Sequence, residues 1–167
     1  MLAVRSTDGA RIAVYDPNPR GRRPVLMLHG WPLSHEMFEY QVNLLLERGI
    51  RAVTIDLRGF GRSDMPAGGY GYDQMARDVL QVVRALNLVP FTLVGFSMGG
   101  AVALRYMRVC RGFGVTKLML LAAAAPSFVR RPDFPYGLPY EEAEEYIRLA
   151  ATDRPQLAEN FSRSIFA

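Results

Sequence analysis

Four short apolar runs, separated by stretches with helical spacing, constrain the fold of this 167-residue chain most strongly. The runs cover Val25–Leu28, Ala52–Ile55, Phe91–Val94 and Lys117–Leu121. A short, continuous apolar run is typical of a strand that is buried on both faces. Strands that alternate with helices predict the α/β class, with a doubly wound, mostly parallel sheet and helices on both of its faces.

Helices and a hairpin fill the stretches around these runs. The pair Asp8-Gly9 is a strong signal for a tight turn between antiparallel strands. Apolar residues at helical spacing predict a helix in each of three intervening stretches. The expected hairpin strands are Leu2–Ser6 and Arg11–Tyr15, and the expected helices are Glu36–Arg48, Asp73–Leu86 and Met98–Met107.

The pattern changes after Ala125, where prolines interrupt an irregular aromatic stretch. Two amphipathic helices are expected beyond it, at Glu141–Ala151 and Pro155–Phe166. We interpret them as part of a helical lid rather than more sheet. The expected organisation is therefore the N-terminal part of an α/β core over residues 1–125 and the start of a lid or cap over residues 126–167.

Composition excludes several classes of protein. The net charge of +4 comes from scattered arginines and not from a dense stripe, so no nucleic-acid partner is expected. The sequence has no apolar run near the ~20 residues of a membrane span. Its N-terminus lacks a signal-peptide pattern, which makes the cytoplasm the expected location, with no membrane partner. One cysteine and two histidines argue against a metal site, and we expect no metal or organic cofactor.

The sharpest chemical signal is Gly95-Phe96-Ser97-Met98-Gly99, a G-x-S-x-G directly after a predicted strand and before a predicted helix. A nucleophilic serine on such a turn needs small neighbours, and the two glycines provide them. The helix N-terminus adds backbone N–H groups where an oxyanion would form. Ser97 is therefore the candidate catalytic nucleophile, with the backbone N–H of Met98 as one oxyanion donor.

A second signal, His29-Gly30-Trp31-Pro32, follows the first of the four apolar runs. The loop after this strand must supply the other oxyanion donor, and the backbone N–H of Trp31 is the candidate. His29 ends a buried strand in a tight turn, which favours a structural hydrogen-bonding role over that of a general base. His35 lies in a loop before a helix, and we expect its ring to be solvated.

A third signal is the glycine-rich stretch Asp56–Asp64, which follows the second apolar run. Its Gly-x-Gly lacks the third glycine and the opening helix of a dinucleotide site. We interpret it as a structural loop in which Asp56 pairs with Arg58.

Together these residues resemble the α/β-hydrolase fold superfamily. The stretches HGWPLS (29–34), DLRGFGRSD (56–64) and GFSMGG (95–100) occur in the order and spacing of that family. More narrowly, the chain is similar to the N-terminal portion of bacterial serine esterases also described as cofactor-free haloperoxidases or perhydrolases. It departs from them at Phe96, where many relatives carry histidine.

The resemblance implies a reaction through an acyl-enzyme. Ser97 would attack an ester, and water would then hydrolyse the acyl group, or hydrogen peroxide would carry it away as a peracid. Pro32 restricts the residue before it, which would fix the carbonyl of Trp31 near the acyl carbon. Gly30, Pro32 and Phe128 are the candidate lining of a mainly apolar pocket, so a small, uncharged acyl or aryl ester is the expected substrate.

The triad is incomplete in these residues. The family order is Ser, then Asp or Glu, then His, yet the two histidines, His29 and His35, both precede Ser97. The run Lys117–Leu121 would also form an exposed apolar edge. We therefore expect a second, C-terminal polypeptide to supply the Asp and the His, and this chain alone to be inactive. Two alternatives stay open: a non-catalytic binding or signalling protein on a truncated hydrolase fold, and a triad that uses His29.

Overall fold

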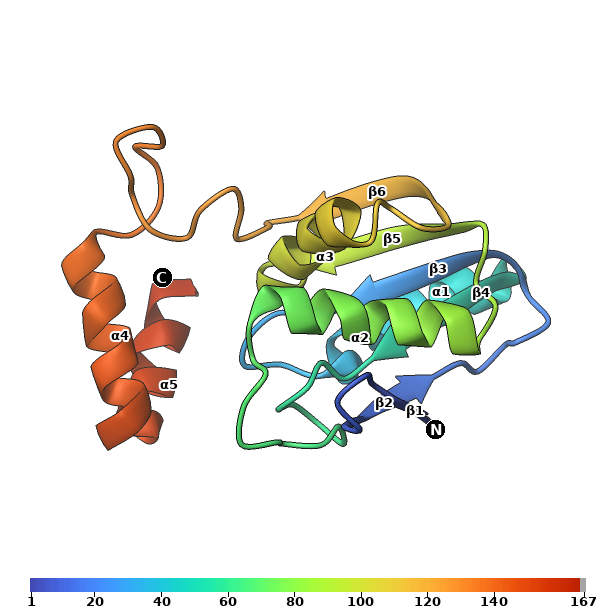
Figure 1. The fold of residues 1–167 in the computed structure, drawn as a ribbon, viewed down its shortest axis with the longest axis horizontal. Coiled ribbons are helices and arrows are strands. Elements are labelled where there is room, and N and C mark those ends of the chain that lie inside the picture. The colour runs from blue at the N-terminus through green and yellow to red at the C-terminus, as the bar shows by residue number, and fades with distance from the viewer. Residues whose placement is uncertain (166–167) are drawn as a thin grey trace. The chain divides into compact units, whose positions relative to one another are not determined.

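A computed structural model describes residues 1–165 and divides the chain into two compact units, Met1–Ala125 and Pro126–Ala167. The first unit is built around a six-stranded sheet in the order β1-β2-β4-β3-β5-β6 (Figure 1). Its strands are β1 (Leu2–Arg5), β2 (Arg11–Tyr15), β3 (Arg22–Leu28), β4 (Ile50–Ile55), β5 (Phe91–Phe96) and β6 (Val115–Leu121).

The sheet is mostly parallel, which confirms the predicted fold class. Strands β4, β3, β5 and β6 run parallel to one another, with Leu26 opposite both Val53 and Leu93. The predicted hairpin forms β1 and β2, and β2 pairs antiparallel with β4. Parallel strands have their carboxyl ends at the same end of the sheet. The loops after Leu28, Ile55 and Phe96 therefore lie close to one another at that end.

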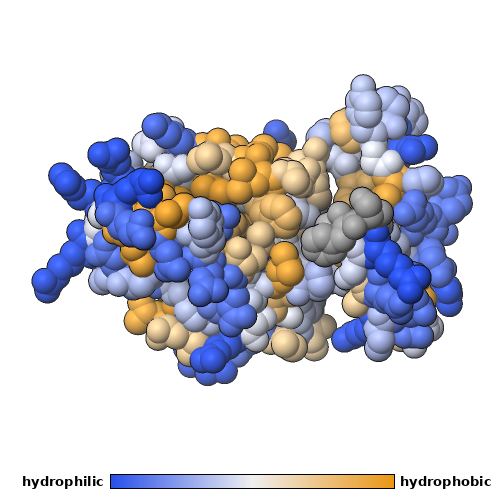
Figure 2. All heavy atoms as spheres, turned by 180° about the vertical axis from the view of Figure 1, so that it is seen from behind, coloured by the Kyte–Doolittle hydropathy of each residue, from blue (hydrophilic) through white to orange (hydrophobic). Residues whose placement is uncertain are grey.

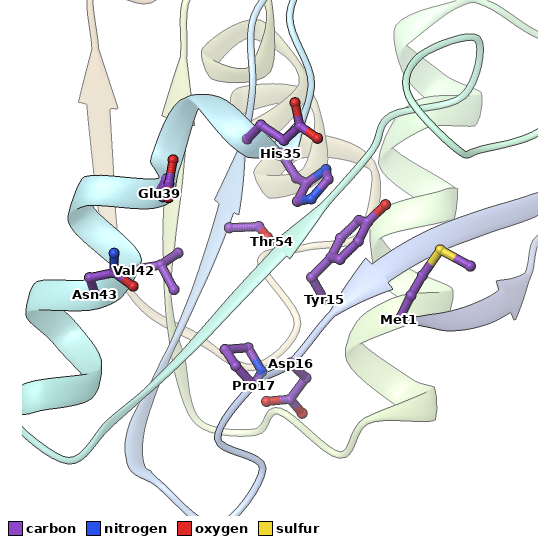
Figure 3. A pocket seen from close by; sticks show the side chains of 10 residues that line it. Met1, Tyr15, Asp16, Pro17, His35, Glu39, Val42, Asn43 and Thr54 are labelled. Atoms are coloured by element: carbon purple, nitrogen blue, oxygen red, sulfur yellow. The ribbon is translucent and has the colours of Figure 1, made fainter.

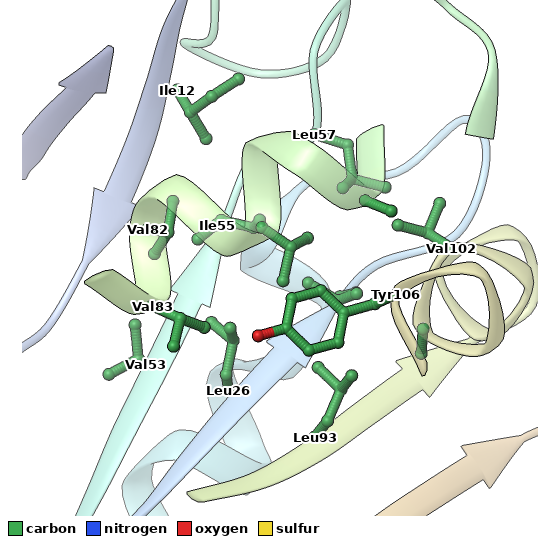
Figure 4. Close-up of a cluster of buried hydrophobic side chains, with 14 of the residues drawn as sticks. Ile12, Leu26, Val53, Ile55, Leu57, Val82, Val83, Leu93, Val102 and Tyr106 are labelled. Carbon is green, nitrogen blue, oxygen red and sulfur yellow. The ribbon is translucent and has the colours of Figure 1, made fainter. Parts of the chain in front are cut away.

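Helices cover both faces of this sheet, and each face has its own apolar cluster. On one face, α2 (Tyr72–Ala85) and α3 (Met98–Val109) pack over the larger cluster, part of which is drawn in Figure 4. On the other face, the 3₁₀ helix η1 (His35–Phe38) leads into α1 (Glu39–Glu47). Phe38 and α1 pack there against Met27, Ala52 and Val94. The helix predicted at 36–48 is thus two elements.

The strand β6 forms one edge of the sheet. It pairs with β5 from Val115 to Leu121, and the structure has no further strand on its other side within residues 1–165. Met119, Leu120 and Leu121 are 40–50% exposed. The predicted exposed apolar edge is therefore present in this unit.

The second unit contains a pair of helices, α4 (Tyr140–Thr152) and α5 (Arg154–Ile165). Leu149 and Leu157 are buried, and the rings of Tyr146 and Phe161 meet edge to face. Both helices occur where sequence periodicity predicts them. The predicted end at Phe166 lies outside the described residues. Among residues 1–165, no helix combines the length and the apolar character needed to cross a membrane.

Candidate active site

Ser97 occupies the turn between β5 and α3 and has a strained backbone. Its φ of 50° and ψ of −117° place it in a region that side-chain-bearing residues rarely adopt. Such a conformation costs about 1–3 kcal/mol and persists only where the surroundings enforce it. The Ser97 side chain makes no capping hydrogen bond to α3, so the hydroxyl is not used to stabilise the helix.

Two glycines make this turn sterically possible. A Cβ at Gly95 would meet the backbone of Gly99 and Gly100, and a Cβ at Gly99 would collide with the carbonyl oxygens of Leu28 and His29. The glycines thus let α3 begin directly over the end of β3. The sequence predicts that both glycines are needed because the turn is crowded. The structure identifies the atoms that crowd each of them.

Hydrogen bonds fix the main chain of Ser97 from two directions. Its N–H donates to the carbonyl of Leu121 at 3.0 Å. Its carbonyl accepts from the N–H of Gly100 and of Ala124, both at 2.9 Å. The serine is therefore tied both to its own helix and to the chain at the end of β6.

The loop after β3 lies against the serine. A Cβ on Gly30 would be 2.9 Å from the Cβ of Ser97, and 3.0 Å from the ring of Phe96. This contact brings the predicted oxyanion loop to the predicted nucleophile. Trp31 is half-buried and Pro32 is exposed, and the peptide bond between them is cis. Met98 begins α3, where the first N–H groups have no acceptor within the helix.

His29 is buried, and both of its ring nitrogens bond to main chain. Nδ1 donates to the carbonyl of Gly30 at 2.8 Å, and Nε2 accepts from the N–H of Leu57 at 3.0 Å. Burial lowers the pKa of His29, so the ring is neutral and keeps this tautomer. This geometry favours the structural role over that of a general base for Ser97.

His35 is not solvated, contrary to the sequence-based expectation. Its Nδ1 bonds to Asp56 Oδ1 at 2.9 Å, and its ring stacks on that of Tyr15 with centroids 3.4 Å apart. Asp56 also accepts hydrogen bonds from the N–H of His35 and of Arg62. Burial alone would raise the pKa of Asp56, but these hydrogen bonds outweigh it, and the pKa lies below its ordinary value.

The predicted pair between Asp56 and Arg58 is wrong. The guanidinium of Arg58 is fully buried and binds both oxygens of Asp78, at 2.6 and 2.7 Å, and Asp8 at 2.8 Å. Asp78 lies on the apolar face of α2, beside Met75 and Val82. A carboxylate on an apolar helical face is a signal for a buried cationic partner, and it could have been found from the sequence.

A cavity of about 510 Å³ lies beside the His35–Tyr15 stack (Figure 3). It is lined by β2, β4 and the helical segment after His35, and Ser97 is not among its lining residues. Phe128 belongs to the second unit, where it is 46% exposed, so its role as pocket lining stays a prediction. Within residues 1–165, no group of three or more His, Cys, Asp or Glu side chains is arranged to hold a metal.

Residues 23–150 match the family described as alpha/beta hydrolase fold. The doubly wound sheet and the glycine-flanked turn at Ser97, here called the nucleophile elbow, agree with this match. The chain belongs to the α/β hydrolase fold family. It is 50% identical over 144 residues to the AB hydrolase superfamily protein YisY of Bacillus subtilis, covering 86% of this chain and 54% of that protein. It is 36% identical to the non-heme chloroperoxidase of Streptomyces lividans, covering 93% and 56%.

Solved structures agree with this assignment. An esterase from Exiguobacterium antarcticum superposes with a TM-score of 0.92 at 44% identity, over 96% of this chain and 59% of that one. A bromoperoxidase from Bacillus anthracis gives 0.87 at 35% identity, over 96% and 58%. The predicted resemblance to esterases and haloperoxidases is confirmed. The chain spans about half the length of the curated relatives it matches.

Proposed function

We propose that this chain carries the nucleophile and the oxyanion hole of a serine ester hydrolase that acts through an acyl-enzyme. The observation that carries the proposal is the strained backbone of Ser97. Its turn is closely packed at Gly95 and Gly99, and Ser97 lies against Gly30. A binding protein has no use for a strained serine whose hydroxyl is left out of helix capping. In nucleophilic catalysis, the same strain presents the hydroxyl to a substrate.

In the proposed reaction, a general base takes the proton of the Ser97 hydroxyl while Oγ attacks the ester carbonyl carbon, and the carbonyl π electrons move to oxygen. The backbone N–H groups of Met98 and Trp31 stabilise this oxyanion. The tetrahedral intermediate then collapses, the C–O bond to the alcohol breaks, and the general base returns the serine proton to the departing oxygen. Water attacks the acyl-enzyme by the same route and releases the acid and free Ser97.

The general base must come from outside these residues. His29 has both ring nitrogens bonded to main chain, and His35 bonds to Asp56 and stacks on Tyr15. We propose that a further polypeptide, here called the complementing segment, supplies the Asp and the His. The curated relatives are nearly twice as long as the matched region, which is room for such a segment.

For the substrate we propose a small, mainly apolar acyl or aryl ester. Gly30 lies against the nucleophile, and neither it nor the two residues that follow it, Trp31 and Pro32, carry a charge. Among the relatives is a bifunctional esterase/perhydrolase from Acinetobacter calcoaceticus, 36% identical over 83% of this chain. That name supports perhydrolysis as a side activity, in which hydrogen peroxide replaces water in the second step.

The test is active-site labelling of the assembled protein. The chain is mixed with the portion of the Bacillus subtilis relative that it does not match, treated with a fluorophosphonate, and digested for mass spectrometry. We expect one phosphonylated residue, Ser97, and none in the chain alone. Ser97→Ala should abolish labelling, and the matched control Ser162→Ala, on the exposed face of α5, should keep it. Labelling at any other residue would contradict the proposal.

A further inference from the structure

Thr54 carries a buried hydroxyl that the fold does not use. The residue is 3% exposed, and its Oγ1 makes no hydrogen bond to any other of residues 1–165. Two other buried hydroxyls, of Ser6 and Ser63, each donate a hydrogen bond to an acceptor within the first unit. A buried polar group without a partner is unfavourable, so a ligand that reached Thr54 would gain a hydrogen bond there.

Thr54 lines the cavity of about 510 Å³ beside the His35–Tyr15 stack. It lies opposite Tyr15 on β2 and Met27 on β3, so these side chains share the face of the sheet that carries α1. In Figure 3 the side chain of Thr54 lies between α1 and Tyr15. The volume of the cavity falls within the range of small-molecule sites, about 300–1,000 Å³.

A buried carboxylate holds the ring of His35 at this cavity. The side chain of Asp56 has no exposed surface, and it accepts hydrogen bonds from Nδ1 of His35 at 2.9 Å and from the Tyr15 hydroxyl at 3.1 Å. Nε2 of His35 bonds to no other residue in the described part of the chain. With its proton on Nδ1, a neutral ring can accept a hydrogen bond from a ligand at Nε2.

The residues that line the cavity carry negative charge. Glu36 and Glu39 have no salt-bridge partner within residues 1–165, and the lining contains no lysine or arginine. A further acidic residue of the lining, Asp16, is already paired with Arg51 at 2.7 Å. A cavity lined by one sign of charge attracts ligands of the opposite sign. Two carboxylates are therefore left to attract a cation and repel an anion.

We propose that this cavity binds a small organic cation, a primary ammonium group on a short apolar chain. The three N–H donors of an ammonium group match three acceptors: Thr54 Oγ1, His35 Nε2 and the carboxylate of Glu39. The carbon chain would lie against Val42 and Pro17, which also line the cavity. The site does not depend on the proposed ester hydrolysis, because the nucleophile is not among its lining residues.

The surroundings favour this class of ligand over others. Figure 2 views the side opposite α2 and α3 and shows hydrophilic side chains around hydrophobic ones. A wholly apolar molecule would leave the Thr54 hydroxyl unpaired. A metal ion lacks ligands, because no group of three or more His, Cys, Asp or Glu side chains is arranged to hold one within the described residues. An ammonium group with a carbon chain suits both parts of the lining.

The experiment is calorimetric titration of the full 167-residue chain with n-hexylammonium. We expect binding in the millimolar range. Two control ligands separate charge from hydrogen bonding: 1-hexanol lacks the charge, and hexyltrimethylammonium keeps the charge without N–H donors. Each should bind about tenfold more weakly or less. Equal affinity for either control, or no binding of n-hexylammonium, would overturn the proposal.

Substitutions locate the ligand. Thr54→Val keeps the shape of the side chain without its hydroxyl, and Glu39→Gln removes a charge; each should weaken binding about tenfold. Thr54→Ser restores a hydroxyl and should bind like the wild type. Glu47→Gln is the matched control, because Glu47 is an exposed residue of α1 outside the cavity, and it should change nothing. Circular dichroism checks that each variant is folded. Wild-type affinity in folded Thr54→Val and Glu39→Gln would place the ligand elsewhere and contradict the proposal.

Discussion

The backbone N–H of Leu57 donates a hydrogen bond to Nε2 of His29 at 3.0 Å, which joins the ends of β3 and β4 through one buried ring. The other nitrogen, Nδ1, donates to the carbonyl of Gly30, the residue that lies against Ser97. A neutral imidazole meets both demands, since it offers one donor and one acceptor. Protonation would remove the acceptor and bury a charge.

This arrangement predicts a loss of stability in mild acid. Burial lowers the pKa of His29 below its ordinary 6.5, so below that pH the unfolded chain binds a proton that the folded chain does not. The free energy of unfolding should therefore be flat above about pH 7.5 and fall by up to ~1.4 kcal/mol per pH unit between 6.5 and the folded pKa. Chemical denaturation of the assembled protein at several pH values measures this slope. His29→Gln should flatten it, and an unchanged slope would contradict the assignment.

Gly99 is predicted to be intolerant of any side chain. A Cβ there would collide with the carbonyl oxygens of Leu28 and His29, which belong to main chain and cannot rotate away. Gly99→Ala should push α3 off β3 and yield protein that is insoluble or molten. Gly68→Ala is the control, because a Cβ at Gly68 meets nothing within 4 Å. Soluble yield and circular dichroism distinguish them, and equal behaviour of the two variants would refute the steric argument.

Removing the buried charge of Asp78 is predicted to lower the free energy of unfolding strongly. Asp78→Asn leaves the fully buried Arg58 with Asp8 as its one carboxylate partner among the described residues, and Asp8 is partly exposed. Breaking a buried pair in this way typically costs about 3–5 kcal/mol. The control Asp73→Asn breaks the exposed pair with Arg105 and should change the denaturation midpoint little. Urea titration gives both values, and a similar loss in both variants would show that burial of Arg58 is not decisive.

Ser97 is predicted to carry the chemistry. In the assembled protein, Ser97→Ala should lower kcat for an aryl ester by roughly 10⁴–10⁶, as in other triad enzymes. KM should change little, because the hydroxyl contributes to the transition state more than to substrate binding. Stopped assays with p-nitrophenyl acetate provide the measurement. Residual activity within a factor of ten of the wild type would assign the nucleophile elsewhere.

Much of the fold could be predicted because it depends on local periodicity. The four apolar runs lie in β3 to β6, and the amphipathic stretch around Val79 lies in α2. The elbow at Ser97 could be predicted as well, since its glycines and flanking elements are neighbours in sequence. In each case the determining interactions lie within a few residues of one another.

The polar partners could not be predicted in the same way. Arg58 bonds to Asp78 on α2 and Asp8 in the hairpin turn, and neither is the near neighbour Asp56. His35, which follows β3, stacks on Tyr15 of β2 although β4 lies between these two strands in the sheet. That strand order is a property of the assembled sheet. The spacing of residues along the chain predicts which side chains share one face of a helix or strand. It does not predict which other element packs against that face.

The hydrogen bond from the Ser97 N–H to the carbonyl of Leu121 links the proposed nucleophile to the edge strand of the sheet. Leu121 ends the edge strand, and edge positions with exposed apolar contacts open locally more easily than the centre of a sheet. Local opening of β6 would therefore break this hydrogen bond to Ser97 before the core of the sheet opened. If the function proposed above holds, covering this edge would steady the nucleophile, and the rate of ester hydrolysis would then report whether the edge strand is covered.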